Sequence, residues 1–168
     1  MFEIAEAKTD SQLDQVRALI RAFVAWHRAT HLEDIERIDR YFDASAFEAE
    51  LAGLPGNYAP PQGALLLALV DGQPAGCVAM RDLGDRTCEM KRMFVPGTFR
   101  GHGVGRGLAE AIVEAAKRAG YATMRLDTSK NQIDAIRLYE RVGFVRTAPY
   151  YELSDDLRKW LVFYEKAL

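Results

Sequence analysis

The chain has 168 residues, of which 49% are hydrophobic and 27% charged, and its formal net charge is -2. This length suits a single domain, residues 1–168, with one core. The slightly acidic balance argues against non-specific binding to nucleic acid, because such binding needs a basic face. No apolar run reaches the roughly 20 residues that a membrane span requires, and Met1 to Ile4 shows no secretory signal. We therefore expect no membrane partner and a cytoplasmic location.

The first third of the chain predicts a strand, two helical regions and a loop. Phe2 to Ala7 alternates apolar and polar residues, which is typical of a short strand. Apolar residues recur at helical spacing from Leu13 to Val24. A second helical region covers roughly Glu33 to Leu51, and the turn-forming residues from Gly53 to Pro61 predict a loop.

Three strands joined by tight turns are predicted next. They cover Ala64 to Val70, Gln73 to Arg81 and Thr87 to Val95, and consecutive hairpins of this kind form an antiparallel meander. Both cysteines, Cys77 and Cys88, lie in these apolar runs, so we expect buried free thiols without a disulfide.

The pattern changes after residue 107. An amphipathic helix is predicted over Leu108 to Ala119, followed by a strand from Thr123 to Thr128. A strand, a crossover helix and a second strand imply a parallel pair with a right-handed connection.

The last third predicts a helix and two strands. Asn131 is suited to cap the helix, which Gly143 ends. The strands are Phe144 to Thr147 and Trp160 to Lys166, separated by a polar turn over Ser154 to Arg158. The expected fold is therefore an α/β (α+β) domain: one mixed sheet, mostly antiparallel, with one parallel pair and helices on both faces.

A glycine-rich stretch, Arg100 to Gly107, separates the meander from the amphipathic helix. Its four glycines free the backbone to turn its N–H groups in one direction, and the helix that follows adds unpaired donors and the positive end of its dipole. Such an arrangement binds a phosphate or pyrophosphate. The alternative is a flexible loop with solvated arginines.

Two common phosphate-binding motifs do not match this stretch. A P-loop needs a Lys-Ser/Thr pair after its last glycine, whereas Leu108 follows Gly107. A dinucleotide fingerprint needs a third glycine where Arg106 or Leu108 stands, although Asp127 lies where a ribose-binding acid is expected.

The motif Arg100-x-x-Gly103-x-Gly105 opening a helix resembles the pyrophosphate-binding motif of the GNAT superfamily of acetyl-CoA-dependent N-acyltransferases. The resemblance extends to the order of elements, to Asn131–Phe144 as a second motif on the cofactor side, and to Cys88–Val95 as the central strand. It is specific from about Ala64 to Phe144. It implies a GNAT-like fold, acetyl-CoA as cosubstrate and, since dimers are common in the family, a homodimer as one oligomeric state.

The resemblance also implies roles for the residues that match these motifs. The main chain of Met93, Phe94 and Val95 would pair with the pantetheine arm. Asn131 would hydrogen-bond the pantetheine region or act only as a helix cap. The pyrophosphate would bind the backbone N–H groups of Arg100, Gly101, His102, Gly103, Val104, Gly105 and Arg106.

Acyl transfer from a thioester to an amine needs an acid for the leaving thiolate and a base for the amine. Tyr139 is our candidate acid, because a phenol with a pKa of about 10 is protonated at neutral pH and the family's tyrosine occupies this place. The alternative is a core tyrosine with a satisfied hydroxyl. Glu89 is our candidate base, and its alternative is a strand-surface glutamate paired with Lys91 or Arg92.

No metal site is predicted. His27 and His31 lie four residues apart on a helix, but the residues between them lack the glutamate of the zinc-protease motif. We interpret them as ordinary surface or cleft-lining histidines.

The sequence thus predicts an N-acetyltransferase that acts on a small-molecule amine or an amino-acid-like acceptor by direct attack. The acceptor pocket would use the first two helices and Tyr58, Tyr150 and Tyr151, unless these tyrosines simply pack. Two alternatives stay open. One is a catalytically inactive acyl-CoA-binding sensor or interaction module, and the other is a nucleotide-binding domain.

Overall fold

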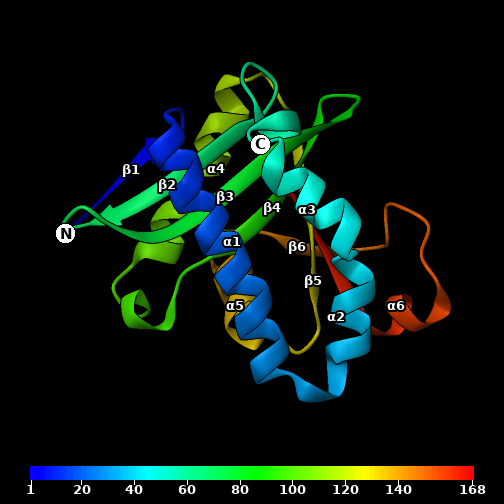
Figure 1. Ribbon diagram of the computed structural model, residues 1–168. Helices are drawn as coiled ribbons and strands as arrows, with labels where there is room; N and C mark the ends of the chain where they lie inside the picture. The colour runs from blue at the N-terminus through cyan, green and yellow to red at the C-terminus, as the bar shows by residue number, and fades with distance from the viewer.

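A seven-stranded mixed sheet forms the centre of the computed structural model, which describes residues 1–168 (Figure 1). The strands follow the spatial order β1-β2-β3-β4-β5-β7-β6, and only β4 and β5 run parallel. This confirms the predicted fold class and the single parallel pair. The strands are β1 (Phe2–Glu6), β2 (Ala64–Val70), β3 (Gln73–Gly84), β4 (Thr87–Phe94), β5 (Thr123–Ser129), β6 (Val145–Thr147) and β7 (Leu161–Ala167).

Helices cover both faces of the sheet. One face carries α1 (Asp10–Thr30), α2 (Ile35–Tyr41) and α3 (Ala44–Ala52), and the other carries α4 (Val104–Arg118) and α5 (Ile133–Arg141) (Figure 1). A short helix, α6 (Asp155–Trp160), precedes β7. None of these helices combines the length and the apolar character that crossing a bilayer would take.

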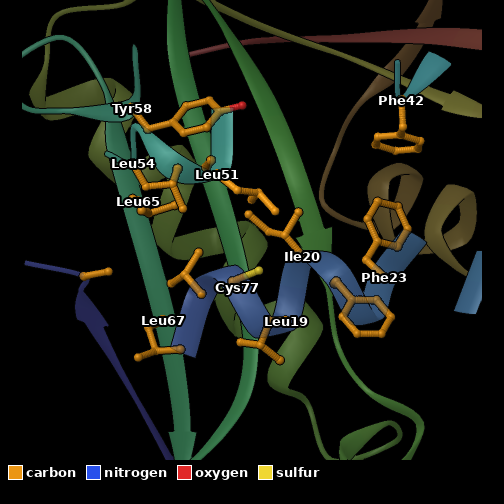
Figure 2. Packing of buried hydrophobic residues seen from close by; sticks show 14 of the residues in the cluster. Leu19, Ile20, Phe23, Phe42, Leu51, Leu54, Tyr58, Leu65, Leu67 and Cys77 are labelled. Atoms are coloured by element: carbon orange, nitrogen blue, oxygen red, sulfur yellow. The ribbon is translucent and has the colours of Figure 1, made fainter. Parts of the chain in front are cut away.

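The core on the α1 side is built from the apolar stripe that the sequence places on this helix. Leu19, Ile20 and Phe23 are buried and pack towards Leu67 and Cys77 of the sheet (Figure 2). Burying each such side chain contributes about 1.5–3 kcal/mol. Cys77 and Cys88 are both buried and free, as expected.

The predicted single helical region from Glu33 to Leu51 is wrong, because the structure has two helices there. The side chain of Asp43 accepts a hydrogen bond from the Ala46 N–H at 3.0 Å and so caps a new helix, α3. The apolar pattern continued through this break, and the capping residue was the overlooked signal.

Three predictions in the last third of the chain are also wrong. Asn131 does not cap α5, whose N-cap is Gln132. The polar segment Ser154 to Arg158 is not a turn but the start of α6, where Ser154 accepts from the Leu157 N–H at 3.3 Å. Trp160 ends this helix and does not begin β7.

Candidate active site

Strands β4 and β5 diverge in the middle of the sheet. Their pairing covers three residue pairs and ends at Glu89 opposite Arg125. Beyond this point β4 remains paired only with β3, and β5 only with β7. The facing edges therefore carry main-chain groups without a strand partner, and such an edge can pair with an extended ligand.

A cavity of about 50 Å³ lies at this divergence. Its walls come from β4, β5, α1, α2, α5 and the α6–β7 junction. The cavity thus reaches from the helices on one face of the sheet to α5 on the other. Tyr139 and Met93, two of the predicted site residues, line it.

The glycine-rich loop presents free main-chain donors at the start of α4. Gly101 and Gly103 have φ values of 81° and 83°, a left-handed conformation that suits glycine. The N–H of Arg100 donates to the Gly97 carbonyl at 3.3 Å, and that of Gly107 donates to Gly103 at 2.9 Å. The six N–H groups between them, from Gly101 to Arg106, donate to no acceptor within the chain.

The charged side chains of this loop already have partners. The guanidinium of Arg100 donates to the Val95 carbonyl at 2.9 Å and stacks 4.4 Å from the centre of the Trp26 ring. Arg106 donates to Glu110 at 2.7 Å, and His102 is exposed. The anion-binding capacity of the loop therefore rests on its main chain and the α4 dipole more than on its arginines.

Tyr139 is buried, with 6% of its surface exposed, and its hydroxyl makes no hydrogen bond within the chain. Burial, and then the negative charge of Asp127, raise the pKa of Tyr139 above its ordinary value. The hydroxyl is therefore protonated at neutral pH, as an acid catalyst must be.

Glu89 is buried, and of the two partners considered in the sequence Lys91 lies close to it, whereas Arg92 pairs with Glu50. Arg81 donates to its Oε1 at 2.8 Å, Tyr150 donates to its Oε2, and the Lys91 ammonium lies 3.9 Å away. Glu89 is therefore not a strand-surface residue.

A second buried carboxylate, Asp127, lines the cavity directly. Tyr41 donates to it at 2.7 Å, Tyr151 also donates, and the Lys91 ammonium is 3.6 Å away. Burial raises the pKa of Asp127, but the charge of Lys91 and the two hydroxyls outweigh burial and hold this pKa below its ordinary value. The sequence had singled out Asp127 only for the ribose of a dinucleotide, and no local signal showed that it faces Lys91.

Asn131 contacts the opposite helical layer. Its amide donates to Asp34 at 2.6 Å, and Asp34 is 1% exposed. The bond fixes the loop before α5 against the segment before α2, so the amide has a partner inside the protein.

Two histidines of α1 occupy different environments. His27 is 1% exposed, lines the cavity, and shares a 2.8 Å hydrogen bond with His31. Burial, and then the proximity of His31, lower the pKa of His27 to about 4, so it is neutral at physiological pH. His27 is therefore a cleft-lining residue and not a surface one.

The three residues at the end of β4 have distinct environments. Met93 lines the cavity, whereas the Phe94 ring packs 5.4 Å from that of Phe23. The Val95 carbonyl is the acceptor for Arg100. Any pairing of this segment with a ligand must therefore use main-chain groups other than the Val95 carbonyl.

The residues present fit acetyl-CoA. The six free N–H groups suit a pyrophosphate, and the unpaired edge of β4 suits an amide-bearing arm. The hydroxyl of Ser129 is buried without a hydrogen-bond partner and belongs to a residue that lines the cavity, so a polar group of a ligand would satisfy it.

Comparison with known proteins defines the class. Residues 17–144 match the model of the acetyltransferase (GNAT) family. An uncharacterised N-acetyltransferase of Schizosaccharomyces pombe is 40% identical over 104 residues, which are 61% of this chain and 64% of that protein.

Solved structures share the fold over the whole chain. An acetyltransferase from Streptococcus agalactiae superposes with a TM-score of 0.75 at 23% identity, covering 99% of this chain and 98% of that one. The PaiA N-acetyltransferase of Thermoplasma acidophilum, solved with coenzyme A, gives 0.70 at 17% identity, covering 100% and 99%.

The chain belongs to the GNAT family of acetyltransferases. The predicted class of enzyme, a GNAT N-acetyltransferase, and the predicted cosubstrate, acetyl-CoA, are confirmed at the level of the family.

Proposed function

We propose that residues 1–168 form one acyltransferase domain that moves an acetyl group from acetyl-CoA to the primary amine of a small-molecule or amino-acid-like acceptor. The single observation that carries this proposal is the divergence of β4 and β5 beside Tyr139. The divergence places the unpaired main-chain edge of β4 next to the Tyr139 hydroxyl, which makes no hydrogen bond within the chain, in one cavity. The free N–H groups of Gly101 to Arg106 would hold the pyrophosphate, and the main chain of Met93 to Val95 would align the pantetheine arm.

The proposed reaction is direct attack. The acceptor amine, once deprotonated, forms a bond to the thioester carbon while the C–S bond breaks. The Tyr139 hydroxyl gives its proton to the departing thiolate, and a carboxylate accepts the proton that the acceptor ammonium loses before attack. The second proton, which the nitrogen loses as the amide forms, restores the Tyr139 phenol. Both products, the amide and the thiol of coenzyme A, are then neutral at the reacting atoms.

Glu89 is the proposed base, with the Tyr150 hydroxyl joining its carboxylate to the β6–β7 segment. Asp127 is a second candidate, and a specific observation favours it, because this carboxylate lines the cavity and Glu89 does not. Glu89→Gln and Asp127→Asn separate the two. In the variant that lacks the base, the acidic limb of the pH–rate profile should no longer follow the ionisation of a carboxylate, and kcat should fall by about 100-fold or more.

Acetyl-CoA and a panel of amines, with free thiol as the readout, test the activity. For Tyr139→Phe we expect unchanged acetyl-CoA affinity and a kcat lowered by about 100-fold or more. Its stability should change little, since the hydroxyl makes no hydrogen bond within the chain. Tyr164→Phe is the matched control, because it removes a hydroxyl that donates to Glu140 at 3.0 Å and lies outside the cavity lining.

Three results would contradict the proposal in different ways. Absence of acetyl-CoA binding by calorimetry would refute it entirely. Tight binding with no turnover on any amine would favour the inactive acyl-CoA sensor. Full turnover by Tyr139→Phe would remove Tyr139 from the mechanism.

A further inference from the structure

β4 contains a bulge where it leaves β5. Lys91 pairs with Ala79 and Phe94 pairs with Cys77, so β4 has one residue more than β3 across this interval. Within the bulge Arg92 has a φ of 58°. This left-handed conformation is unfavourable for a residue with a side chain, and it persists only where the surroundings hold it.

The side chain of Arg92 is held by α3. Its Nε and Nη2 donate to the two carboxylate oxygens of Glu50 at 2.8 and 2.9 Å. The guanidinium also lies 5.0 Å from the centre of the Phe42 ring, and only 11% of the side chain is exposed. Two parallel bonds to one carboxylate fix the direction of the guanidinium as well as its position.

Glu50 is itself anchored. It belongs to the last turn of α3, and the next residue, Leu51, is fully buried and accepts a hydrogen bond from Arg17 of α1 at 2.7 Å. The ion pair therefore connects the bulge to α3, which lies on the same face of the sheet as α1 and is hydrogen-bonded to it through Arg17 (Figure 1).

The bulge borders the cavity. Lys91, Arg92 and Met93 all line it, across from Tyr139, whereas Glu50 does not. The conformation of Arg92 sets the direction in which the chain continues into Met93, so it also sets where the unpaired main-chain groups of this segment point.

From this geometry we propose that Glu50 is a positioning residue for acyl transfer. It holds Arg92 in the left-handed conformation and thereby aims the main chain of Arg92 and Met93 at the acyl thioester. This inference rests on the proposed function, because it requires the thioester to lie along β4.

Four variants separate the effect of the backbone conformation at the bulge from the effect of the ion pair. Arg92→Gly and Arg92→Ala both remove the ion pair, but only glycine adopts a positive φ without a steric cost. Glu50→Ala and Glu50→Gln remove the partner instead. Glu48→Ala is the control, because Glu48 lies on the same helix in an exposed pair with Arg21 at 2.8 Å.

The measurements are kcat, the affinity for coenzyme A, and the carbonyl resonance of bound acetyl-CoA labelled with carbon-13 at the thioester. For Glu50→Ala we expect kcat to fall by about 100-fold, the loss that a displacement of about 1 Å produces. Affinity for coenzyme A should stay within about twofold, because the donors from Gly101 to Arg106 are untouched. The carbonyl resonance should move towards that of free acetyl-CoA.

The remaining variants should form a series. Glu50→Gln should lose less kcat than Glu50→Ala, Arg92→Gly should retain at least about tenfold more kcat than Arg92→Ala, and Glu48→Ala should match the wild type. If Glu50→Ala does not fold, the Arg92 pair and Glu50→Gln still decide the question.

Two results would overturn the inference. One refutes only the role of Glu50, and the other also refutes the proposed function. Acetyl-CoA that binds with the same carbonyl resonance in wild type, Glu50→Gln and Arg92→Ala refutes the role of Glu50 and leaves the proposed function standing. Failure of the wild type to bind acetyl-CoA refutes both.

Discussion

Replacing Lys91 with methionine tests how the sheet tolerates two buried carboxylates. The Lys91 ammonium lies 3.6 Å from Asp127 and 3.9 Å from Glu89, and the three side chains are 12%, 2% and 1% exposed. Unit charges at the shorter distance attract by about 4–5 kcal/mol at an effective dielectric constant of about 20. Methionine preserves most of the volume but leaves Asp127 with the hydroxyls of Tyr41 and Tyr151 and the charge of Arg92. It also removes the hydrogen bond that the Lys91 ammonium donates to the Tyr41 hydroxyl at 2.8 Å. We therefore expect Lys91→Met to lose about 3–5 kcal/mol of unfolding free energy at pH 7.5, or about 6–20 °C in Tm.

The loss of unfolding free energy in Lys91→Met should become smaller as pH falls. In the wild type the pKa of Asp127 lies below its ordinary value, because the Lys91 charge and two hydroxyls outweigh burial. Such a carboxyl stabilises the fold above its unfolded pKa of about 4, and this contribution disappears as pH falls through the folded value. Without Lys91, burial dominates and the folded pKa rises above the unfolded one. The variant then becomes more stable as pH falls, so its deficit relative to wild type shrinks between pH 7.5 and 4.5.

Urea denaturation at both pH values measures this difference. Asp127→Asn in the Lys91→Met background is the control, since it removes the unpaired charge and should recover part of the lost stability. The reasoning would be refuted if Lys91→Met lost the same unfolding free energy at both pH values and if the loss in the double variant equalled the sum of the losses in Lys91→Met and Asp127→Asn alone.

Two further predictions follow from the cavity and the loop. Gly103→Ala places a side chain at a φ of 83°, so we expect a cost of about 1–2 kcal/mol and, by calorimetry, about tenfold weaker binding of coenzyme A. Gly97→Ala, with open space around its Cβ, should change neither quantity. The pKa of His27 is lowered to about 4 by burial and then by His31. A folded pKa below the unfolded value of about 6.5 means that stability is lost as pH falls from 6.5 towards 4, by up to about 3 kcal/mol. His27→Gln should flatten this part of the stability curve in urea titrations, and an unchanged slope would show that His27 is not its source.

The features predicted correctly from sequence depend on local patterns. Apolar runs and tight turns defined the meander from β2 to β4, and the switch to helical spacing at the glycine-rich stretch defined α4 and the parallel crossover to β5. These signals span fewer than about 15 residues each, which is the range over which periodicity and turn chemistry act. The start of α4 was placed at Leu108, four residues late, because glycines have weak helix propensity.

The features that were missed depend on contacts between distant segments. Asn131 was predicted to cap a helix, but its amide bonds to Asp34, 97 positions earlier. The left-handed conformation of Arg92 requires Glu50 on another helix. Nothing in the neighbouring residues distinguishes either case from an ordinary loop or strand, because the partner is specified by the tertiary fold.

The divergence of β4 and β5 explains how an acid and a base from opposite faces of one sheet can serve one reaction. Along β4, Cys88 and Met90 belong to the core cluster that contains Tyr139, whereas Glu89 alternates to the other face, where Tyr150 covers it. A continuous sheet would separate the proposed acid from the proposed base by a layer of backbone.

The gap beyond Glu89 and Arg125 removes that layer. The cavity between the two strands is lined by Tyr139 from one face and by Asp127 from the other, whereas Glu89 lies outside its lining. A one-residue shift in the register of β4 would exchange the two faces and place Glu89 in the apolar cluster. The bulge at Arg92 comes after this gap has opened, so it redirects the edge of β4 without exchanging the faces of Glu89 and Met90. The proposed chemistry thus depends on where pairing stops as much as on which side chains are present.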